Sequence, residues 1–569
     1  MKLKALPFRV GGLIAMLLIT VSSTSAQSTT LEQVTALFNS SCSASSCHDA
    51  SSPAASLNLS GSASDIYNEL VNVNPTNPNA NGKGWKRVVP GSPETSYLMA
   101  KIARASWDSS YPLEVADGNP MPTATDLAPE DIELVRQWIQ FGAQETGEVV
   151  DPAILSDFYN DAPGTHIAQI EAPPAPAADE GFQIRMGPIF LEPGEEVEYF
   201  FKKPVSFNDS IEVSRTHVFF NDESHHFILY KYDDPDDASS YRAGYRELYE
   251  PGAAPQTDVT SVAAWQDAYD IPLPEGTSYW WGAEEVLDMN FHLINPYMDQ
   301  IMPATVYVNI YTQPHLSPSA NVQMFSQILP INITEALTGT GFIGQDLIIP
   351  GDGSEYTFED DIWFPFDATW HIWYLSSHTH ARGTDYDIYL RDADNTQIFE
   401  GFYDVDYTFN QGFYDWEHPP VRFFEPLLEV PMGFPNGIHH EAKYINNTGS
   451  TITWGDRTTD EMMLFFIQYT ERPLDLTGLD VQEFAGEFTA GPNPFRNAST
   501  IRYKLDKAAN VQLEVFDAMG RQVALLTNGM MQAGTHQAVF NPDHLSNGLY
   551  TVKLSVDGAS ASHKVMRLN

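Results

Sequence analysis

The sequence predicts a mainly β protein, in which two tandem jelly-roll-like β-sandwiches follow a small α-helical domain and precede a last small β-sandwich. Between about 183 and 475, runs such as VEYFFKKPV, ATVYVNIYT and YDIYLRD are rich in aromatic and β-branched residues. Several alternate with a period of two, and Pro, Gly, Asn and Asp interrupt them, as in strands joined by turns. Long helical patterns are scarce there, and a region of this length favours two sandwiches, at 183–325 and 326–475, over one.

Composition excludes one class of partner. The chain of 569 residues carries 75 acidic and 30 basic side chains, which gives a formal net charge of −45. A polyanion of this kind is repelled by nucleic acids and by anionic lipid surfaces. We therefore expect no nucleic-acid partner.

The first 26 residues have the three parts of a secretory signal peptide. MKLKALPFR is basic, VGGLIAMLLITV is a short apolar core, and STSAQ supplies small residues for cleavage. The apolar core is too short to cross a bilayer comfortably. We expect an exported protein that resides outside the cell or at its surface.

The two cysteines lie together in SSCSASSCHDA, within a predicted domain at 28–148. Cys42, Cys47 and His48 form a C-x4-C-H pattern, a lengthened form of the C-x-x-C-H motif that attaches haem c. In this interpretation both thiols bond to the haem, and His48 is the proximal iron ligand. The alternative is a disulfide that closes a short loop beside an incidental histidine. In both cases the rest of the chain is disulfide-free.

The residues that follow favour the haem interpretation. GNPMPTATDLAPEDIELVRQWIQFGA contains a Met-Pro loop and then an amphipathic helix, on which Leu134, Trp138 and Ile139 share a face before Gly142 ends it. Over residues 28–146 this order resembles small bacterial c-type cytochrome domains, which begin with the haem motif and end with a W-I-x-x-G-A helix.

The resemblance implies a covalent haem c with His48 as the proximal ligand and Met121 as the distal ligand. Met99, in an apolar helix-like run, and Met16, in the signal peptide, are weaker candidates for the distal position. Ligation by histidine and methionine fills both axial positions and suits electron transfer. The long loop between the cysteines departs from the family pattern. Residues 149–182, which include EAPPAPAADEG, are expected to form an Ala/Pro linker.

Candidate metal ligands lie in four short segments of the β-rich region. They are His225 and His226 in ESHHFILYKY, His292 in LDMNFHLINP, His378 and His380 in SSHTHARG, and Met462 or Met463 in TTDEMMLFFIQY. Residues i and i+2 of a strand point to the same side, so the HTH segment aims two imidazoles at one place. The adjacent histidines of the HH segment point to opposite faces of a regular strand, so one metal holds both only at a strand end, twist or bulge.

Each segment also has a purely structural explanation. A lone histidine such as His292 in a β-run is more often half-buried and hydrogen-bonded than a ligand. One methionine of a doublet in a strand faces the core in any case. We interpret His217, His371 and His418 as structural residues. The second HH doublet, His439 and His440, is interpreted as structural or as part of the surface.

The order HH, H, HTH and DEM resembles that of the copper type II, ascorbate-dependent monooxygenases, the family of peptidylglycine α-hydroxylating monooxygenase and dopamine β-monooxygenase. The similarity covers about 183–473 and includes EHP at 417–419. It implies two copper ions with these ligands: His225, His226 and His292 for an electron-transfer copper, and His378, His380 and Met462 for the catalytic copper that activates O2. In the family the methionine follows Asp-Glu, which selects Met462 over Met463. Two imidazoles and a soft thioether favour Cu(I).

The same resemblance implies the reaction. One atom of O2 enters a C–H bond of a small-molecule or peptide-like substrate, and the other leaves as water, so two electrons must come from an external donor. The family uses ascorbate; here we hypothesise that another reductant, the fused haem domain, feeds the copper ions. Two alternatives are a non-catalytic copper and haem protein for electron transfer or binding at the cell surface, and an adhesin-like sandwich with incidental histidines.

The residues at the predicted substrate site differ from those of the peptide-amidating enzymes. Those enzymes hold a carboxylate with an arginine two residues before HTH and with an asparagine and a tyrosine after the methionine. The aligned positions here are Ser376, Leu464 and Phe466. The resemblance therefore implies the chemistry, while the missing carboxylate clamp favours a less polar substrate.

Residues 489–569 are predicted to be a separate small β-sandwich of alternating strands and turns. The Asn-Pro-Phe start, the D-x-x-G-R turn, the G-L-Y segment and the basic last strand resemble the C-terminal sorting domain of the type IX secretion system of Bacteroidetes-like bacteria. That resemblance implies an address read by the type IX secretion machinery. A generic immunoglobulin-like stalk is the alternative.

Overall fold

The computed structural model describes most of residues 28–567. The gaps fall at 46, 104–106, 109, 124, 161–163, 222–225, 249, 251–258, 266–269, 317–318, 320, 401–420, 456, 458, 475–487, 493–494, 517–521, 542–544, 546–547 and 558. Several predictions lie outside the described residues: the signal peptide at 1–26 with Met16, His225, His418, and EHP at 417–419.

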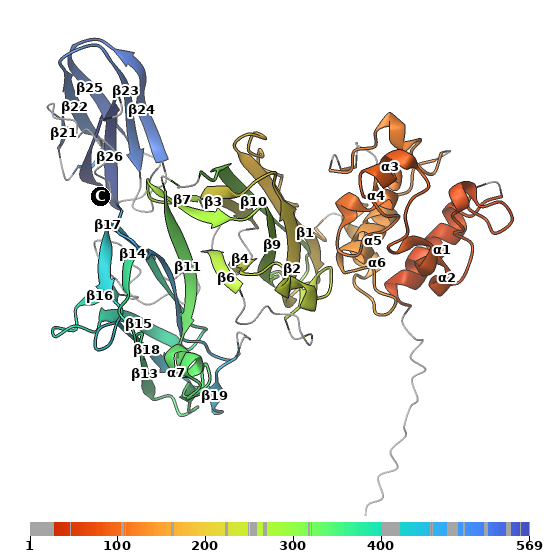
Figure 1. Cartoon of the computed structure of the whole chain (residues 1–569), viewed down its shortest axis with the longest axis horizontal. Helices are drawn as coiled ribbons and strands as arrows, with labels where there is room; N and C mark the ends of the chain where they lie inside the picture. The colour runs from red at the N-terminus through yellow and green to blue at the C-terminus, as the bar shows by residue number, and fades with distance from the viewer. Residues whose placement is uncertain are drawn as a thin grey trace, which may run out of the picture. The chain divides into compact units, whose positions relative to one another are not determined.

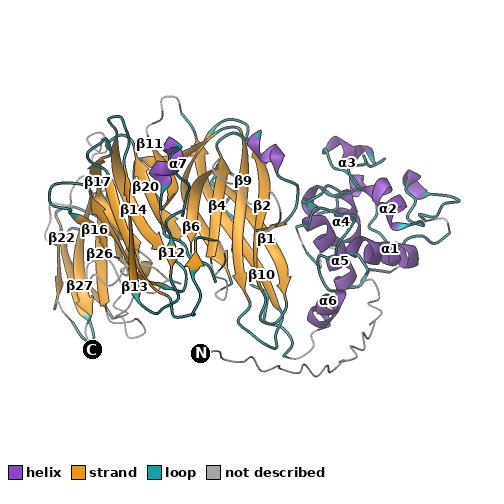
Figure 2. Ribbon diagram, turned by 90° about the horizontal axis from the view of Figure 1, so that it is seen from below, coloured by secondary structure: helices purple, strands orange, loops and turns teal. Residues whose placement is uncertain are grey.

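The described residues are mainly β and form several sheets, whereas helices are concentrated in the N-terminal part (Figures 1 and 2). The chain divides into two compact units, residues 1–160 and 161–569. These findings confirm the predicted mainly β class with a small helical part before it. The jelly-roll order of the sandwich strands stays a prediction. No described helix combines the length and the apolar character needed to cross a membrane.

The first unit is built from short helices. They are α1 (Thr30–Ser41), α2 (Ala63–Leu70), α3 (Pro78–Gly82), α4 (Tyr97–Ile102), α5 (Pro129–Gln140) and α6 (Pro152–Tyr159). α5 is the predicted amphipathic helix, and Leu134, Trp138 and Ile139 are buried on it. Gly142 follows at φ 94°, a conformation that only glycine adopts without steric cost, and so ends the helix where the sequence predicts.

A buried polar cluster ties α6 to α5. Glu133 and Arg136 on α5 form an ion pair, and Arg136 also pairs with Asp108 at 2.9 Å. The hydroxyl of Tyr159 on α6 donates a hydrogen bond to Glu133 at 2.6 Å. The segment predicted as a linker, 149–182, therefore begins with a helix that packs onto the first unit.

One large sheet runs through the β-rich unit in the order β1-β10-β3-β8-β11-β20-β14-β17, with β7 paired to β3. Its strands are β1 (Gly181–Leu191), β3 (Ile211–Phe220), β7 (Asp270–Pro272), β8 (Thr277–Trp281), β10 (Met302–Pro314), β11 (Val322–Pro330), β14 (Thr369–His378), β17 (Val421–Pro431) and β20 (Leu464–Thr470).

Smaller sheets accompany it. The five-stranded sheet β5-β2-β9-β4-β6 belongs to the first half of the unit, and the sheets β13-β18-β15-β16 and β12-β19 belong to the second. Their strands and the helix of the second half are β2 (Glu196–Ser206), β4 (His226–Tyr232), β5 (Arg246–Glu247), β6 (Val259–Trp265), β9 (Glu284–Ile294), α7 (Ile333–Thr338), β12 (Ile348–Ile349), β13 (Glu355–Ile362), β15 (Gly383–Leu390), β16 (Gln397–Glu400), β18 (Ile438–Ile445) and β19 (Ile452–Thr453).

Strand β11 joins the two predicted sandwiches. It pairs in parallel with β8, where Val322 lies opposite Thr277, and antiparallel with β20, where Met324 lies opposite Thr470. The predicted division at 325/326 therefore falls inside a strand. The two halves share one sheet and are not two closed bodies joined by a linker.

The pairing of β14 with β20 gives this sheet two different faces. His378 lies opposite Leu464 in an antiparallel ladder. Leu375 and Phe465 face a hydrophobic core that the strands β15 and β18 close from the other side. Because side chains alternate along a strand, His378 and Phe466 lie on the opposite face, away from that core.

The C-terminal tail is a small sandwich of two sheets, β21-β22-β25 and β24-β23-β26-β27. Alternate residues such as Ile501, Val511 and Val565 are buried between them. The prediction of a separate β-sandwich at 489–569 is confirmed for the described residues. Its strands are β21 (Phe488–Gly491), β22 (Ser499–Leu505), β23 (Ala509–Phe516), β24 (Gln522–Met531), β25 (Gly534–Phe540), β26 (Gly548–Val556) and β27 (Ala559–Arg567).

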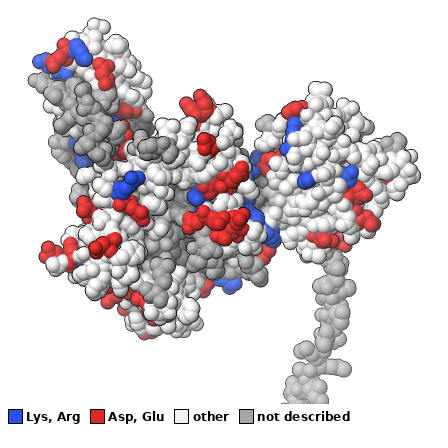
Figure 3. Space-filling model, viewed as in Figure 1, with Lys and Arg blue, Asp and Glu red and all other residues white. Residues whose placement is uncertain are grey.

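Acidic side chains gather in patches on the surface of the β-rich unit in the view of Figure 3, and Lys and Arg are sparser there. This distribution agrees with the net charge of −45. A few charged groups are nevertheless buried, and one pair lies in the five-stranded sheet.

That pair is Arg246 on β5 and Asp288 on β9. Their charged atoms lie 2.5 Å apart, and the side chains are 1% and 0% exposed. The hydroxyl of Tyr232 on β4 donates to the same carboxylate at 2.7 Å. These contacts therefore tie the edge strand β5 and the neighbouring strand β4 to β9, the strand that carries His292.

We expect Arg246→Met to lower the free energy of unfolding of the β-rich unit by about 3–5 kcal/mol, because it leaves the carboxylate of Asp288 buried without its cation. Urea denaturation followed by tryptophan fluorescence measures this loss. Arg242→Met is the matched control, since Arg242 and Glu250 form a pair in which both side chains are about a third exposed, and a pair of this kind contributes about 0–1 kcal/mol. Equal losses in both variants would contradict the structural role assigned to Arg246.

Candidate metal centre

Two of the predicted ligands form a cross-strand pair in the five-stranded sheet. His226, the first residue of β4, lies directly opposite His292 on β9, and their ring centroids are 5.0 Å apart. Residues opposite one another in an antiparallel pair have their Cβ atoms about 4.5–5.5 Å apart, so the ladder itself brings the two rings together. His292 is 3% exposed.

A carboxylate orients one of these imidazoles. The Nε2 atom of His292 lies 3.0 Å from Glu196 Oε1, and its Nδ1 atom lies 4.0 Å from Glu198 Oε2. Both glutamates come from β2, the neighbour of β9. Histidines that bind metals commonly have one ring nitrogen held by a carboxylate, which fixes the plane of the ring.

The HTH segment reaches the same place from the other half of the unit. β14 ends at His378, and the ring centroids of His378 and His380 are 5.2 Å apart. The ring centroid of His378 is also 6.1 Å from that of His226. The described histidines thus form one continuous series of neighbouring rings, in the order His292, His226, His378 and His380.

A buried glutamate holds the loop that carries His380. Glu461 is 0% exposed, and its carboxylate accepts backbone N–H bonds from His380 at 2.9 Å and Arg382 at 2.6 Å. Burial raises the pKa of Glu461 to about 7 and lowers the pKa of His380 to about 4, so the imidazole is neutral near pH 7. Its Nδ1 atom lies 3.2 Å from the carbonyl oxygen of Asp460, and donation to that oxygen leaves Nε2 as the ligand atom.

The two methionines of the DEM segment have different surroundings. Met463 is buried in the core between β14-β20 and the four-stranded sheet, whereas Met462 lies outside that core and is partly exposed. Met462 lies two residues before Leu464, the residue of β20 that pairs with His378. The carbonyl oxygen of Met462 also accepts a hydrogen bond from Tyr444 at 2.7 Å. Met463 is thus a core residue, and the choice of Met462 as the ligand stays a prediction.

The positions that replace the carboxylate clamp flank the histidines. Ser376 pairs with Phe466, and both lie on the face of β14-β20 that carries His378. The ring of Phe466 is 6.3 Å from the ring of His378. Leu464 lies directly opposite His378 on the same face. The described surroundings of these imidazoles on β20 are therefore apolar.

The candidate haem ligands lie in the first unit. Cys42 caps the C-terminal end of α1, and the backbone N–H of His48 donates to the carbonyl oxygen of Cys42 at 3.2 Å. Both cysteines are free in the structure, and burial raises the pKa of the Cys42 thiol to about 11. The Nδ1 atom of His48 lies 3.1 Å from the carbonyl oxygen of Leu57, which leaves Nε2 as the available ligand atom.

The two methionines proposed for the distal position also differ. Met121 is partly exposed in a loop, and its backbone N–H donates a hydrogen bond to the carbonyl oxygen of Lys101 at 2.7 Å. Met99 is fully buried on α4. The assignment of Met121 as the distal ligand stays a prediction.

Sequence patterns did not indicate the groups that orient the ligands. Glu196 stands in an acidic run, and Glu461 is one of the two acidic residues before the Met-Met doublet. Neither residue has a spacing that distinguishes it from a solvent-exposed carboxylate. Only the DEM motif could have pointed to Glu461, because it places that carboxylate directly before the predicted ligand Met462.

Residues 491–567 match the family model described as the secretion system C-terminal sorting domain. The tail is therefore a type IX sorting domain, and the protein is exported to the cell surface or beyond it. The secretion machinery that reads such tails is a partner of the chain. No curated protein matches the chain in sequence.

Solved structures give only weak similarities. PorZ, a surface component of the type IX secretion system of Porphyromonas gingivalis, is 16% identical over 18% of this chain and 14% of its own, with a TM-score of 0.11. The β-glucuronidase of Dictyoglomus thermophilum is 10% identical over 37% of this chain and 36% of its own, with a TM-score of 0.11. That of Lactobacillus rhamnosus is 13% identical over 43% and 45%, with a TM-score of 0.12. The chain thus spans less than half of each, and similarity at this level is no evidence for a shared fold or activity.

We expect Glu461→Gln to lower the affinity of the HTH segment for added copper about 10- to 100-fold, as loss of a group that orients ligands commonly does. Glutamine keeps one acceptor oxygen but turns an NH2 group toward a backbone N–H, which disturbs the loop. Competition with a Cu(I) chelator measures the affinity. Asp460→Asn is the control, because it makes the same change of charge one residue away and keeps the backbone carbonyl that faces His380. Equal affinities in all three proteins would show that Glu461 does not position the ligands.

Proposed function

We propose that the protein is a secreted, copper-dependent monooxygenase that hydroxylates a C–H bond of a weakly polar substrate with O2. The observation that carries the proposal is the convergence of His226, His292, His378 and His380 from two sheets, with neighbouring ring centroids 5.0–6.1 Å apart. Isolated structural histidines have no reason to meet across two halves of a fold. The proposal rests also on the order of the ligand segments along the chain.

The donor set fits copper. Imidazole nitrogen binds both oxidation states of copper, and a thioether such as that of Met462 selects the reduced state. His292, His378 and His380 are 3–6% exposed, so a metal there is shielded from bulk water. The strands that carry these residues are paired on both sides within their sheets, which makes the ligand positions rigid.

Copper bound at these residues would supply O2 activation and one-electron transfer. The chain's own groups hold the ligands: Glu196 orients His292, and the carbonyl of Asp460 orients His380. Leu464 and Phe466 offer apolar contact to a substrate beside His378 and exclude water. Among the described residues, Ser376 occupies the position of the arginine that would bind a substrate carboxylate, so this position favours a less polar substrate.

The fused helical unit is the proposed source of electrons. Cys42, Cys47 and His48 would attach a haem c, and Met121 would complete its ligation. The carbonyl of Leu57 holds Nδ1 of the His48 ring, which leaves Nε2 as the atom that would bind iron. A haem of this kind transfers electrons and binds no substrate, which suits a donor to a reaction that consumes two of them.

We expect the full-length protein to bind two copper ions per chain and to consume O2 in a copper-dependent manner, with a hydroxylated product from a library of weakly polar metabolites. Met462→Leu removes the thioether and should abolish product formation while histidine-bound Cu(II) remains. Met463→Leu is the matched control, since a volume-conserving change in a core costs less than about 1.5 kcal/mol and leaves the site intact. Copper binding without O2 uptake would favour a non-catalytic electron-transfer or binding protein. Absence of stoichiometric copper would favour an adhesin-like sandwich.

We expect reduced haem in the full-length protein to be reoxidised when copper and O2 are supplied, at a rate that stopped-flow spectroscopy of the haem band can follow. Cys47→Ser weakens haem attachment and should slow hydroxylation when haem is the electron donor, but not when ascorbate is in excess. If reduced haem stays reduced, and Cys47→Ser hydroxylates as fast as the wild type, the haem does not feed the copper ions.

A further inference from the structure

The outer face of the four-stranded sheet carries a second group of metal-ligating side chains. On β18, His440 and Ala442 point into the core, so His439 and Glu441 point outward. The partner strand β13 places Asp361 opposite His439 and Glu359 opposite Glu441. The ladder therefore puts four side chains on one surface, in two adjacent rows.

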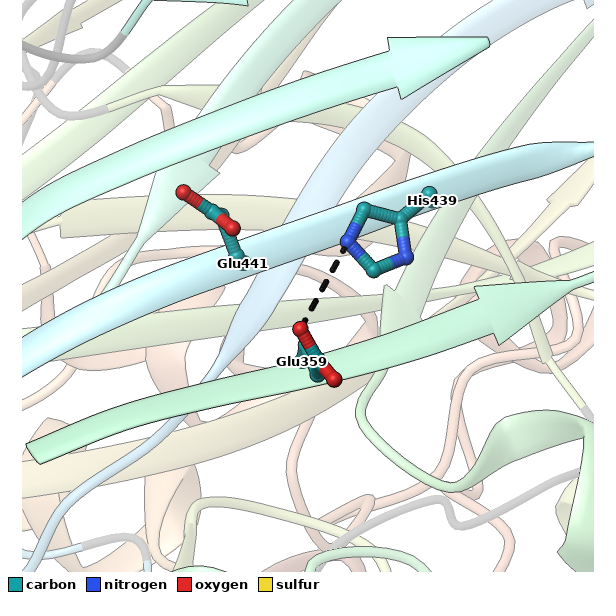
Figure 4. A group of neighbouring side chains, drawn as sticks. All are labelled: Glu359, His439 and Glu441. Carbon is teal, nitrogen blue, oxygen red and sulfur yellow. Dashed lines mark ion pairs between the residues drawn. The ribbon is translucent and has the colours of Figure 1, made fainter. Parts of the chain in front are cut away.

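Three of these residues converge. One ligand atom each from Glu359, His439 and Glu441 lies within 4.8 Å of the others (Figure 4). The Nε2 atom of His439 is 4.0 Å from Glu359 Oε2, an interaction drawn as the dashed line in Figure 4. The close-up shows both carboxylates on the side of His439 that bears this nitrogen.

A fourth residue holds the imidazole in place. The Nδ1 atom of His439 lies 2.9 Å from Asp361 Oδ1, and the other oxygen of Asp361 lies 3.0 Å from Arg391 Nε. Asp361 is therefore fixed by Arg391 and accepts a hydrogen bond from Nδ1, which leaves the lone pair of Nε2 directed toward the glutamates. Such a carboxylate–histidine pair is the usual support of a histidine that binds a metal.

The charge pattern calls for a cation. Glu441 on the central strand lies opposite Glu359 on one side and Asp387 on the other. Like charges directly opposite one another destabilise a sheet. Lys443 forms its 2.5 Å ion pair with Asp385 in the next row, and its charge also acts on Asp387 and Glu441. The carboxylates of Glu359 and Glu441 lie together beside the imidazole of His439.

We propose that Glu359, His439 and Glu441 bind a divalent transition-metal cation of the Zn²⁺ class, with Asp361 as the residue that positions His439. One imidazole and two carboxylates are a ligand set that Zn²⁺ accepts, and three protein ligands leave one coordination position open. The open position faces solvent, because the Glu359 side chain is 70% exposed and that of His439 is 27% exposed.

This site is separate from the proposed copper centre. His440, the inward neighbour of His439, donates or accepts a hydrogen bond with Tyr386 at 2.7 Å and contacts Phe465 on β20. Phe465 belongs to the core, while His378 lies on the opposite face of β14-β20. The hydrophobic core of the second half therefore lies between the two sites. The adjacent histidines of this doublet divide into a structural residue and a ligand.

The test is the number of Zn²⁺ ions that the metal-free, full-length protein retains in equilibrium dialysis, counted by mass spectrometry. We expect His439→Gln and Glu441→Gln each to retain one ion fewer per chain than the wild type. Asp361→Asn should bind the same ion about 10- to 100-fold more weakly. Glu355→Gln is the matched control, because it removes the same charge from the same face of β13, four residues from Glu359, and should retain every ion.

Two results would overturn the proposal. One is an unchanged Zn²⁺ count in both His439→Gln and Glu441→Gln, which would mean that a protonated His439 balances the carboxylates through ion pairs alone. The other is an equal loss in Glu355→Gln, which would mean diffuse binding by acidic surface. Circular dichroism of each variant confirms that it is folded, and Glu359→Gln replaces any variant that is not. A His378→Ala protein keeps the Zn²⁺ ion at this face even if the copper centre is lost, so the two proposals fail independently.

Discussion

The ladder between β14 and β20 is the constraint on which the second half of the β-rich unit depends. It sets which residues enter the core and which face the other half, because one residue of slip would exchange the two faces. With His378 opposite Leu464, the core receives Phe465 and Met463, and the other face receives the imidazoles and their apolar surroundings. The same strand pairing thus determines both the hydrophobic core of this half and the positions of the proposed ligands.

Local periodicity explains what the sequence could reveal. The period of two predicted that His378 and His380 point the same way, and the 3.6-residue period predicted α5 with Trp138 on its buried face. Both inferences use residues within one element, where covalent geometry fixes the relation. The tail was predictable for the same reason, since its strands are short, alternate regularly and pair with near neighbours.

Relations between distant strands were out of reach. His226 stands opposite His292 and also beside His378, and both relations depend on pairing between strands far apart in the chain, which no local pattern encodes. The carboxylates that orient ligands are a sharper case. In the sequence nothing distinguishes Glu196, Glu461 and Asp361 from the other acidic residues of a chain that carries 75 of them. Only the fold shows which carboxylates orient a histidine and which are exposed to solvent.

Strand β11 has a consequence for how this protein can be divided. It hydrogen-bonds to β8 and to β20, so its backbone belongs to the sheet of both halves. A cut at 325/326 would divide β11, so that Val322 and Gln323 stay paired with β8 while the residues from 326 to 330 stay paired with β20. Each fragment would then carry a shortened strand at the edge of its sheet, the kind of edge that recruits other chains into aggregates. The two ligand-bearing halves therefore share a strand and are not joined by a free linker. We expect the two halves to fold together, so a fragment that is to be expressed alone should include all of 181–470.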